Sequence, residues 1–129
     1  MTDTRTQLIP GPDHPITVER WPGHVTVRRG TVVIAETDRA FELRESTYPA
    51  VYYVPLDDVH RDFLRRSEVH TWCPYKGEAS YFDLIATKDT DEMPASVWYY
   101  PDPFAAVGDI KDHVAFYADR FTVSAMPAD

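Results

Sequence analysis

Cys73 and Lys76 are the residues whose types and spacing best suit chemistry in this sequence. Cys73 directly precedes a predicted four-residue turn, Pro74 to Gly77, and Lys76 lies within it. The sequence on either side of this turn is typical of strands. A hairpin here would bring a thiol and an amine to one site. A nearby lysine charge favours the thiolate, which is the nucleophilic form. A lysine among aromatic rings can bind an anionic group or act as an amine nucleophile.

Both residues also have an ordinary structural interpretation. A single cysteine at a strand end is commonly a small buried hydrophobe, and a lysine in a turn is commonly solvated. His70 lies three residues before Cys73, and residues three apart on a strand face opposite sides. We therefore expect no Cys–His pair within this strand. A nucleophilic and a structural role both stay open for Cys73 and Lys76.

Aromatic residues form a further signal. On a strand, Tyr52 and Tyr53 face opposite sides, and so do Tyr99 and its two neighbours. One set can pack the core while the other lines a concavity for a planar or anionic small molecule. The candidate ligand-binding residues are His14, Tyr48, Tyr52, Tyr53, Trp72, Tyr81, Trp98 and Tyr100.

Glu45 is the candidate general base, because it lies two residues before Thr47-Tyr48-Pro49. Asp13 and His14 can fold back over a site or form a solvated tail. The five histidines show no spacing typical of metal ligands, so we expect neither a metal nor a cofactor.

Composition limits the class of protein. A formal net charge of −8 argues against nucleic acid or an anionic membrane as the main partner. One cysteine excludes an internal disulfide and a zinc site with several cysteine ligands. No signal-peptide pattern or membrane-length apolar run is visible, so we expect a cytoplasmic protein. The expected partner is a small molecule, and the oligomeric state is open between monomer and homodimer.

A chain of 129 residues is predicted to form one domain. We expect an extended arm over residues 1–15, a domain over 16–124 and a tail over 125–129. Residues 16–34 read as a three-stranded meander with turns at Pro22-Gly23 and Arg29-Gly30. A short helix is predicted over 59–66, and a second begins at Pro103 and ends near Gly108. The other strands are expected over 40–44, 51–54, 68–73, 78–86, 97–100, 113–117 and 120–123.

Several segments resemble a bacterial family known as domain of unknown function 427. The most specific is Cys73-Pro74-Tyr75-Lys76-Gly77, and Leu56 is a mild departure where the family often has a basic residue. Together the matching segments span nearly the whole chain in the family's order, over residues 11–16, 45–59, 73–81, 97–101 and 114–120.

The resemblance implies a β-tent fold, similar to the ligand-binding domain of cereblon and to methionine sulfoxide reductase B. Many β-tent domains hold zinc with two pairs of cysteines, a site that one cysteine cannot build. The family has also been labelled a possible nucleotidyltransferase. The sequence shows neither a glycine-rich phosphate loop nor paired metal-binding aspartates.

The sequence therefore predicts a mostly β (α+β), single compact β-tent-like domain of antiparallel strands with two short helices. We expect it to bind a polar or anionic small molecule in an aromatic pocket. If it is an enzyme, Cys73 or Lys76 is the expected nucleophile, with Glu45 or a tyrosine hydroxyl moving protons. The alternatives are a non-catalytic ligand or peptide reader, a nucleotidyltransferase-like enzyme, and a structural partner domain without a pocket.

Overall fold

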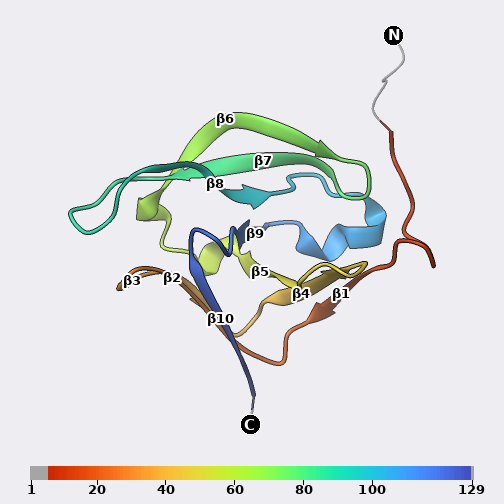
Figure 1. The fold of residues 1–129 in the computed structure, drawn as a ribbon, viewed down its shortest axis with the longest axis horizontal. Helices are drawn as coiled ribbons and strands as arrows, with labels where there is room; N and C mark the ends of the chain where they lie inside the picture. Colours follow the sequence, from red (N-terminus) through yellow and green to blue (C-terminus); the bar gives the residue numbers. More distant parts are fainter. Residues whose placement is uncertain (1–5, 129) are drawn as a thin grey trace.

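The computed structural model describes residues 6–128, which form ten strands in two antiparallel sheets (Figure 1). The prediction of a mostly β domain of antiparallel strands is confirmed. The large sheet contains, in spatial order, β1 (Ile16–Arg20), β4 (Phe41–Glu45), β5 (Val51–Pro55), β9 (His113–Phe116), β8 (Met93–Tyr99), β7 (Gly77–Leu84) and β6 (Leu64–Cys73). The small sheet contains β10 (Thr122–Pro127), β2 (Gly23–Arg29) and β3 (Val32–Thr37).

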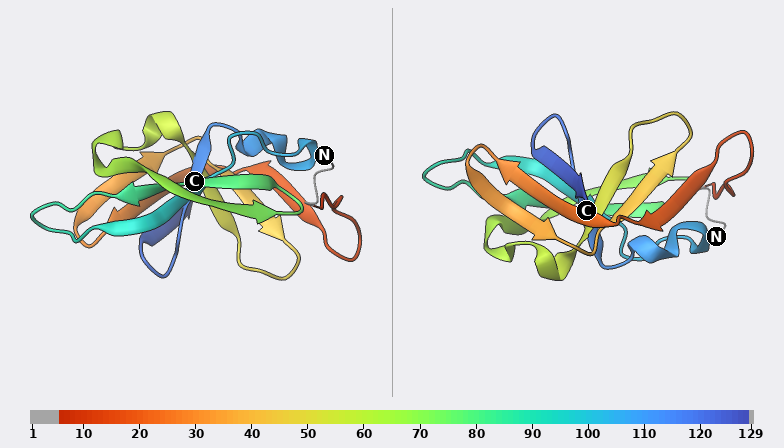
Figure 2. Two further views of the ribbon diagram at one scale, coloured as in Figure 1. Left: turned by 90° about the horizontal axis from the view of Figure 1, so that it is seen from above. Right: turned by 90° about the horizontal axis from the view of Figure 1, so that it is seen from below.

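The large sheet is strongly bent, so that its edge strands β6 and β1 lie on opposite sides of the molecule (Figure 1). A short 3-10 segment, η3 (Ala105–Ile110), lies between the β6–β7 turn and β1. Two views at right angles to the first place η3 and the N-terminal arm at the same end of the molecule (Figure 2). The bend therefore leaves one open side, which η3 covers.

Each face of the large sheet packs its own core. The face toward η3 buries Tyr53 and Ala115 together with Val107 and Ile110 of η3. The face toward the small sheet buries Val54 and Val114 from the same two strands. Central strands buried on both faces need continuous apolar runs, which the sequences of β5 and β9 supply.

The predicted meander is wrong in its first strand. β1 pairs with β4 in the large sheet, whereas β2 pairs with β3 and β10 in the small one. The chain crosses between the sheets at Trp21-Pro22, where the N–H of Trp21 donates to the carbonyl of Ala40. Because Pro22 has no N–H, it donates to neither ladder, although its carbonyl accepts a hydrogen bond from the N–H of Ala128. Alternation predicted the strands, but not the partner of β1.

The predicted helices are shorter than expected. Within 59–66 there is a single 3-10 turn, η2 (Arg61–Phe63), and β6 begins at Leu64; another 3-10 turn, η1 (Leu56–Asp58), precedes the predicted helix. The carbonyl of Phe63 accepts a hydrogen bond from Ile85, so the chain already follows the hairpin there. The second predicted helix is η3, a 3-10 segment that contains Gly108 rather than ending at it. Short helices are costly to nucleate, and strand partners were available.

The last strand reaches further than the sequence indicated. β10 continues to Pro127 and pairs with β2 along its whole length. Residues 125–127, which were assigned to the tail, therefore belong to the small sheet. Residues 1–5 and 129 of the predicted arm and tail lie outside the described residues.

Gly23 is predicted to be essential for joining β10 to β2. A Cβ at this position would overlap the backbone of Met126 and Pro127, and backbone atoms cannot move aside. We expect Gly23→Ala to lower the free energy of unfolding by about 2 kcal/mol, as overpacking does. Gly11→Ala is the matched control because a Cβ there has nothing within 4 Å. Urea unfolding of both variants measures the difference, and equal stabilities would contradict the assigned contact.

Candidate functional site

The β6–β7 hairpin ends in a tight turn of residues 74–76. Cys73 pairs with Gly77, and the N–H of Lys76 donates to the Cys73 carbonyl at 3.2 Å. The predicted four-residue loop is one residue too long, because Gly77 already belongs to β7. Gly77 has a φ of +114°, a backbone conformation that residues other than glycine rarely adopt.

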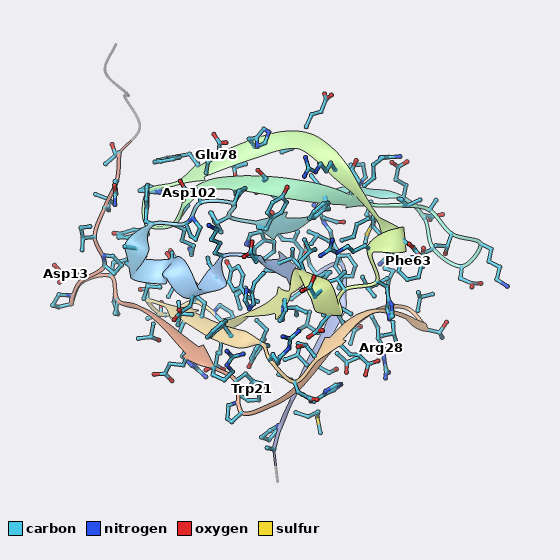
Figure 3. All side chains as sticks on the ribbon, turned by 180° about the vertical axis from the view of Figure 1, so that it is seen from behind. Asp13, Trp21, Arg28, Phe63, Glu78 and Asp102 are labelled. Carbon is cyan, nitrogen blue, oxygen red and sulfur yellow. The ribbon has the colours of Figure 1, made fainter. Side chains whose placement is uncertain are left out.

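The turn packs against the segment before η3. The carbonyl of Lys76 accepts a hydrogen bond from the N–H of Phe104 at 3.0 Å. Figure 3 shows Glu78 and Asp102 close to this end of the hairpin. This packing buries the Lys76 side chain, since the residue keeps only 8% of its surface exposed. A solvated lysine, the ordinary expectation, is therefore wrong.

Lys76, Glu45 and His14 form a connected polar row. The Nζ of Lys76 donates to Oε1 of Glu45 at 2.5 Å and lies 3.7 Å from Sγ of Cys73. The other carboxylate oxygen, Oε2, lies 2.7 Å from Nε2 of His14. Glu45 ends β4, so the row joins an early strand, the β6–β7 turn and the N-terminal arm.

The row keeps Glu45 ionised. Burial raises the pKa of the Glu45 carboxyl, but hydrogen bonds from Lys76 and His14 outweigh it. The pKa of Glu45 therefore lies below its ordinary value of 4.5. At neutral pH the negative carboxylate balances the positive charge of Lys76 within the site.

The N-terminal arm follows the β6–β7 turn. The N–H of Leu8 donates to the carbonyl of Pro74 at 2.8 Å, and the ring of His14 stacks on Tyr75 with centroids 4.2 Å apart. Of the two arm residues predicted to reach the site, only His14 does so. Asp13 is exposed and lies at the outer edge of the arm (Figure 3).

A cavity of about 270 Å³ lies beside this polar row. Lys76 and Glu45 form its charged end, and aromatic rings form most of its remaining wall. The alternative of a structural partner domain without a pocket does not account for this cavity. The lining residues are Leu43, Glu45, Tyr48, Pro49, Val51, Tyr53, Lys76, Tyr81, Trp98, Tyr100 and Tyr117.

The aromatic wall is ordered by contacts among its own members. The Nε1–H of Trp98 donates to the hydroxyl of Tyr53 at 3.2 Å, and the Trp98 ring lies 4.6 Å from that of Tyr117. Burial raises the pKa of Tyr53 and Tyr100, and burial with a hydrogen bond to Tyr81 raises the pKa of Tyr117 to about 12. These hydroxyls are therefore neutral near pH 7 and can donate hydrogen bonds.

Four predicted site residues lie outside the cavity wall, and His14 is one of them, because it reaches the site only through Glu45. Cys73 touches Lys76 but packs with the buried cluster on the η3 side of the sheet. Trp72 points to the other side of β6, where it meets Phe104 and donates to the carbonyl of Thr6. Tyr52 faces away from Tyr53, and its hydroxyl donates to Glu42.

Sequence reasoning missed Tyr117 and Leu43, both of which line the cavity. Each lies two residues from another residue on the same face, Tyr117 from buried Ala115 and Leu43 from Glu45. Extending the alternation by one step would have found both. Val51, two residues before Tyr53 on β5, carries the same signal, whereas Pro49 lines the cavity without one.

No group of three or more His, Cys, Asp or Glu side chains in residues 6–128 is arranged to hold a metal ion. In the same residues, no helix has the length and apolarity to cross a membrane.

One known family matches nearly all the residues that form the two sheets. A family described as a domain of unknown function (DUF427) matches residues 17–126. The chain belongs to this family. No curated protein matches the chain. The DUF427 match includes Glu45, Lys76 and every ring of the cavity wall, whereas His14 precedes it. The DUF427 description assigns no activity.

The Lys76–Glu45 ion pair is predicted to stabilise the fold in a pH-dependent way. Glu45→Gln leaves the buried Lys76 charge without a carboxylate, so we expect a loss of roughly 3 kcal/mol in the free energy of unfolding at pH 7. The folded pKa of Glu45 is below the unfolded value of 4.5. The stabilisation is therefore complete above pH 4.5 and disappears as the pH falls through the folded pKa.

Urea unfolding of wild type and Glu45→Gln between pH 3 and 7 measures this, and the two curves should converge at the acid end. The control is Glu68→Gln, which changes an exposed carboxylate on β6. A gap between wild type and Glu45→Gln that stays constant with pH would show that the carboxylate charge does not stabilise the fold.

Proposed function

We propose that this protein binds a small polar molecule in the cavity beside Lys76. The ligand places a hydrogen-bond acceptor on Lys76 Nζ and a donor on Glu45, and its flat part lies against the aromatic wall. The observation that carries this proposal is the buried Lys76–Glu45 pair at 2.5 Å, which opens onto an aromatic cavity.

Lys76 retains capacity for a ligand. An ammonium group has three N–H donors. Glu45 and Cys73 take two of them, and the third has no partner among the described residues. The side chain of Tyr100 also lines the cavity, and its neutral hydroxyl can donate a hydrogen bond to a ligand. Buried polar groups usually find partners, so these atoms favour a polar ligand.

The charge balance narrows the chemistry of that ligand. The sequence predicted a polar or anionic molecule, but an anion beside Lys76 would also meet the Glu45 carboxylate. A neutral group with adjacent acceptor and donor atoms, such as a carboxamide, complements both residues at once. We therefore favour a carboxamide-type group over a carboxylate.

The cavity sets the size of the ligand part that it encloses. A volume of about 270 Å³ is at the lower end for ligand pockets, which suits one ring with a short substituent. Tyr53, Trp98 and Tyr117 supply flat apolar surfaces for stacking against such a ring.

A catalytic function has one observation in its favour, the 3.7 Å approach of Cys73 Sγ to Lys76 Nζ. Two others favour binding without a covalent step. Cys73 is not part of the cavity wall, and Lys76 in an ion pair is an ammonium without a lone pair. Glu45 is the only carboxylate of the described cavity wall, so the paired carboxylates typical of metal-dependent nucleotidyl transfer have no counterpart there.

Benzamide is the probe for this proposal, and its dissociation constant can be measured by NMR titration. We expect Lys76→Gln to weaken binding at least tenfold, as loss of a charged hydrogen bond does. The matched control is Lys88→Gln, which changes an exposed lysine outside the cavity wall. Equal affinity of Lys76→Gln and wild type would refute the assigned role of Lys76. Benzoate should bind more weakly than benzamide, and tighter binding would assign the site to anions instead.

Cys73 is predicted to be dispensable for binding. Because its sulfur lies outside the cavity wall, Cys73→Ala should leave the dissociation constant of benzamide within about twofold of the wild-type value. The same NMR titration measures it, with thermal unfolding as a check on the fold. A tenfold loss of benzamide affinity in a folded Cys73→Ala variant would show that the thiol takes part in binding. It would also restore Cys73 as a candidate nucleophile.

A further inference from the structure

A second hollow adjoins the Lys76 cavity. It has a volume of about 390 Å³ and is called the apolar groove here. It shares five lining residues with the cavity, namely Tyr48, Pro49, Val51, Trp98 and Tyr117. Its remaining residues are Ala50, Tyr52, Phe116, Ala118 and Val123. The two hollows are therefore neighbours with a common wall of residues.

The groove lies where the large sheet splits. β5 and β9 pair only at Val54–Val114 and Pro55–His113, so the start of β5 and the end of β9 are not paired with each other. Tyr52 and Phe116 pack toward the small sheet, whereas Trp98 and Tyr117 pack toward η3. A hollow lined by side chains from both faces must lie in the gap between the two strands.

The charged side chains lie at one end of the two neighbouring hollows. The described lining of the groove contains no Lys, Arg, Asp, Glu or His, whereas the cavity ends at Lys76 and Glu45. Aromatic rings line both parts, with Trp98 and Tyr117 between them. A ligand that fills both parts must be polar at one end and apolar at the other.

We propose that the apolar groove holds the aryl or alkyl tail of the same molecule whose polar head binds Lys76 and Glu45. This inference rests on the proposed function, and it adds the ligand class: an amphipathic amide with a tail too large for the 270 Å³ cavity. The shared lining favours this occupant, because Trp98 and Tyr117 border both hollows and a tail that passes them would reach the groove next.

Two probes separate head from tail. Benzamide carries the head alone, and 4-(benzyloxy)benzamide adds a second ring on a short linker. On wild-type protein we expect the longer compound to bind at least tenfold more tightly, because the tail buries apolar surface in the groove. Dissociation constants come from NMR titration of the full chain.

Variants assign that gain to the groove. Val123→Asp places a charge on the groove wall, and it should remove the gain while leaving the benzamide affinity unchanged. Ala118→Asp, at an exposed groove position, is the second variant in case Val123→Asp does not fold. The matched control is Val69→Asp, since Val69 is exposed on β6 and should leave both affinities as in wild type.

The outcomes are distinguishable. If benzamide binds through Lys76 but the longer compound gains nothing, or keeps its gain in both groove variants, the amphipathic class is wrong and the head site stands. If neither compound binds, both proposals fail. If the protein sediments as a dimer that dissociates on Val123→Asp or Ala118→Asp, the groove belongs to a second copy of this chain and the tail site is overturned.

Discussion

The buried ion pair between Lys76 and Glu45 is the interaction on which the site depends. Burying either charge alone would be strongly unfavourable, so each residue stabilises the other in place. The pair also connects parts of the molecule that are not neighbours in the large sheet, since Glu45 ends β4 and Lys76 lies in the β6–β7 turn. His14 adds the N-terminal arm to the same carboxylate. The cavity exists where these three segments meet the aromatic face of the sheet.

The bent sheet supplies the rest of the architecture. A flat sheet would leave β1 and β6 far apart, and the Glu45 and Lys76 side chains could not meet. Bending brings the two ends toward η3, whose Val107 and Ile110 fill the space between them. The cost is incomplete pairing between β5 and β9, which opens the groove beside Trp98. The same geometry that buries the ion pair therefore also produces the adjoining hollow.

Local pattern predicted much of this structure correctly. Alternation placed Tyr53 and Tyr52 on opposite faces, and did the same for Trp98 and Tyr99. Predictions failed where a distant segment competed with local preference. β1 left the expected meander for β4. The end of the segment predicted as a helix, residues 64–66, joined β6 directly after the hydrogen bond between Phe63 and Ile85. Local sequence cannot rank partners that the rest of the chain supplies.

The sequence by itself determined the antiparallel β class, the hairpin at Cys73 and Lys76, and the glycine that its turn requires, because these follow from side-chain period and backbone chemistry over a few residues. Only the tertiary structure decided that Lys76 is buried, that Glu45 and His14 are its neighbours, and that Cys73 lies outside the cavity wall. Glu45 and Lys76 are 31 positions apart, and they meet only because of the strand order and bend of the sheet. That order is set by burial summed over the whole chain, which no local spacing records.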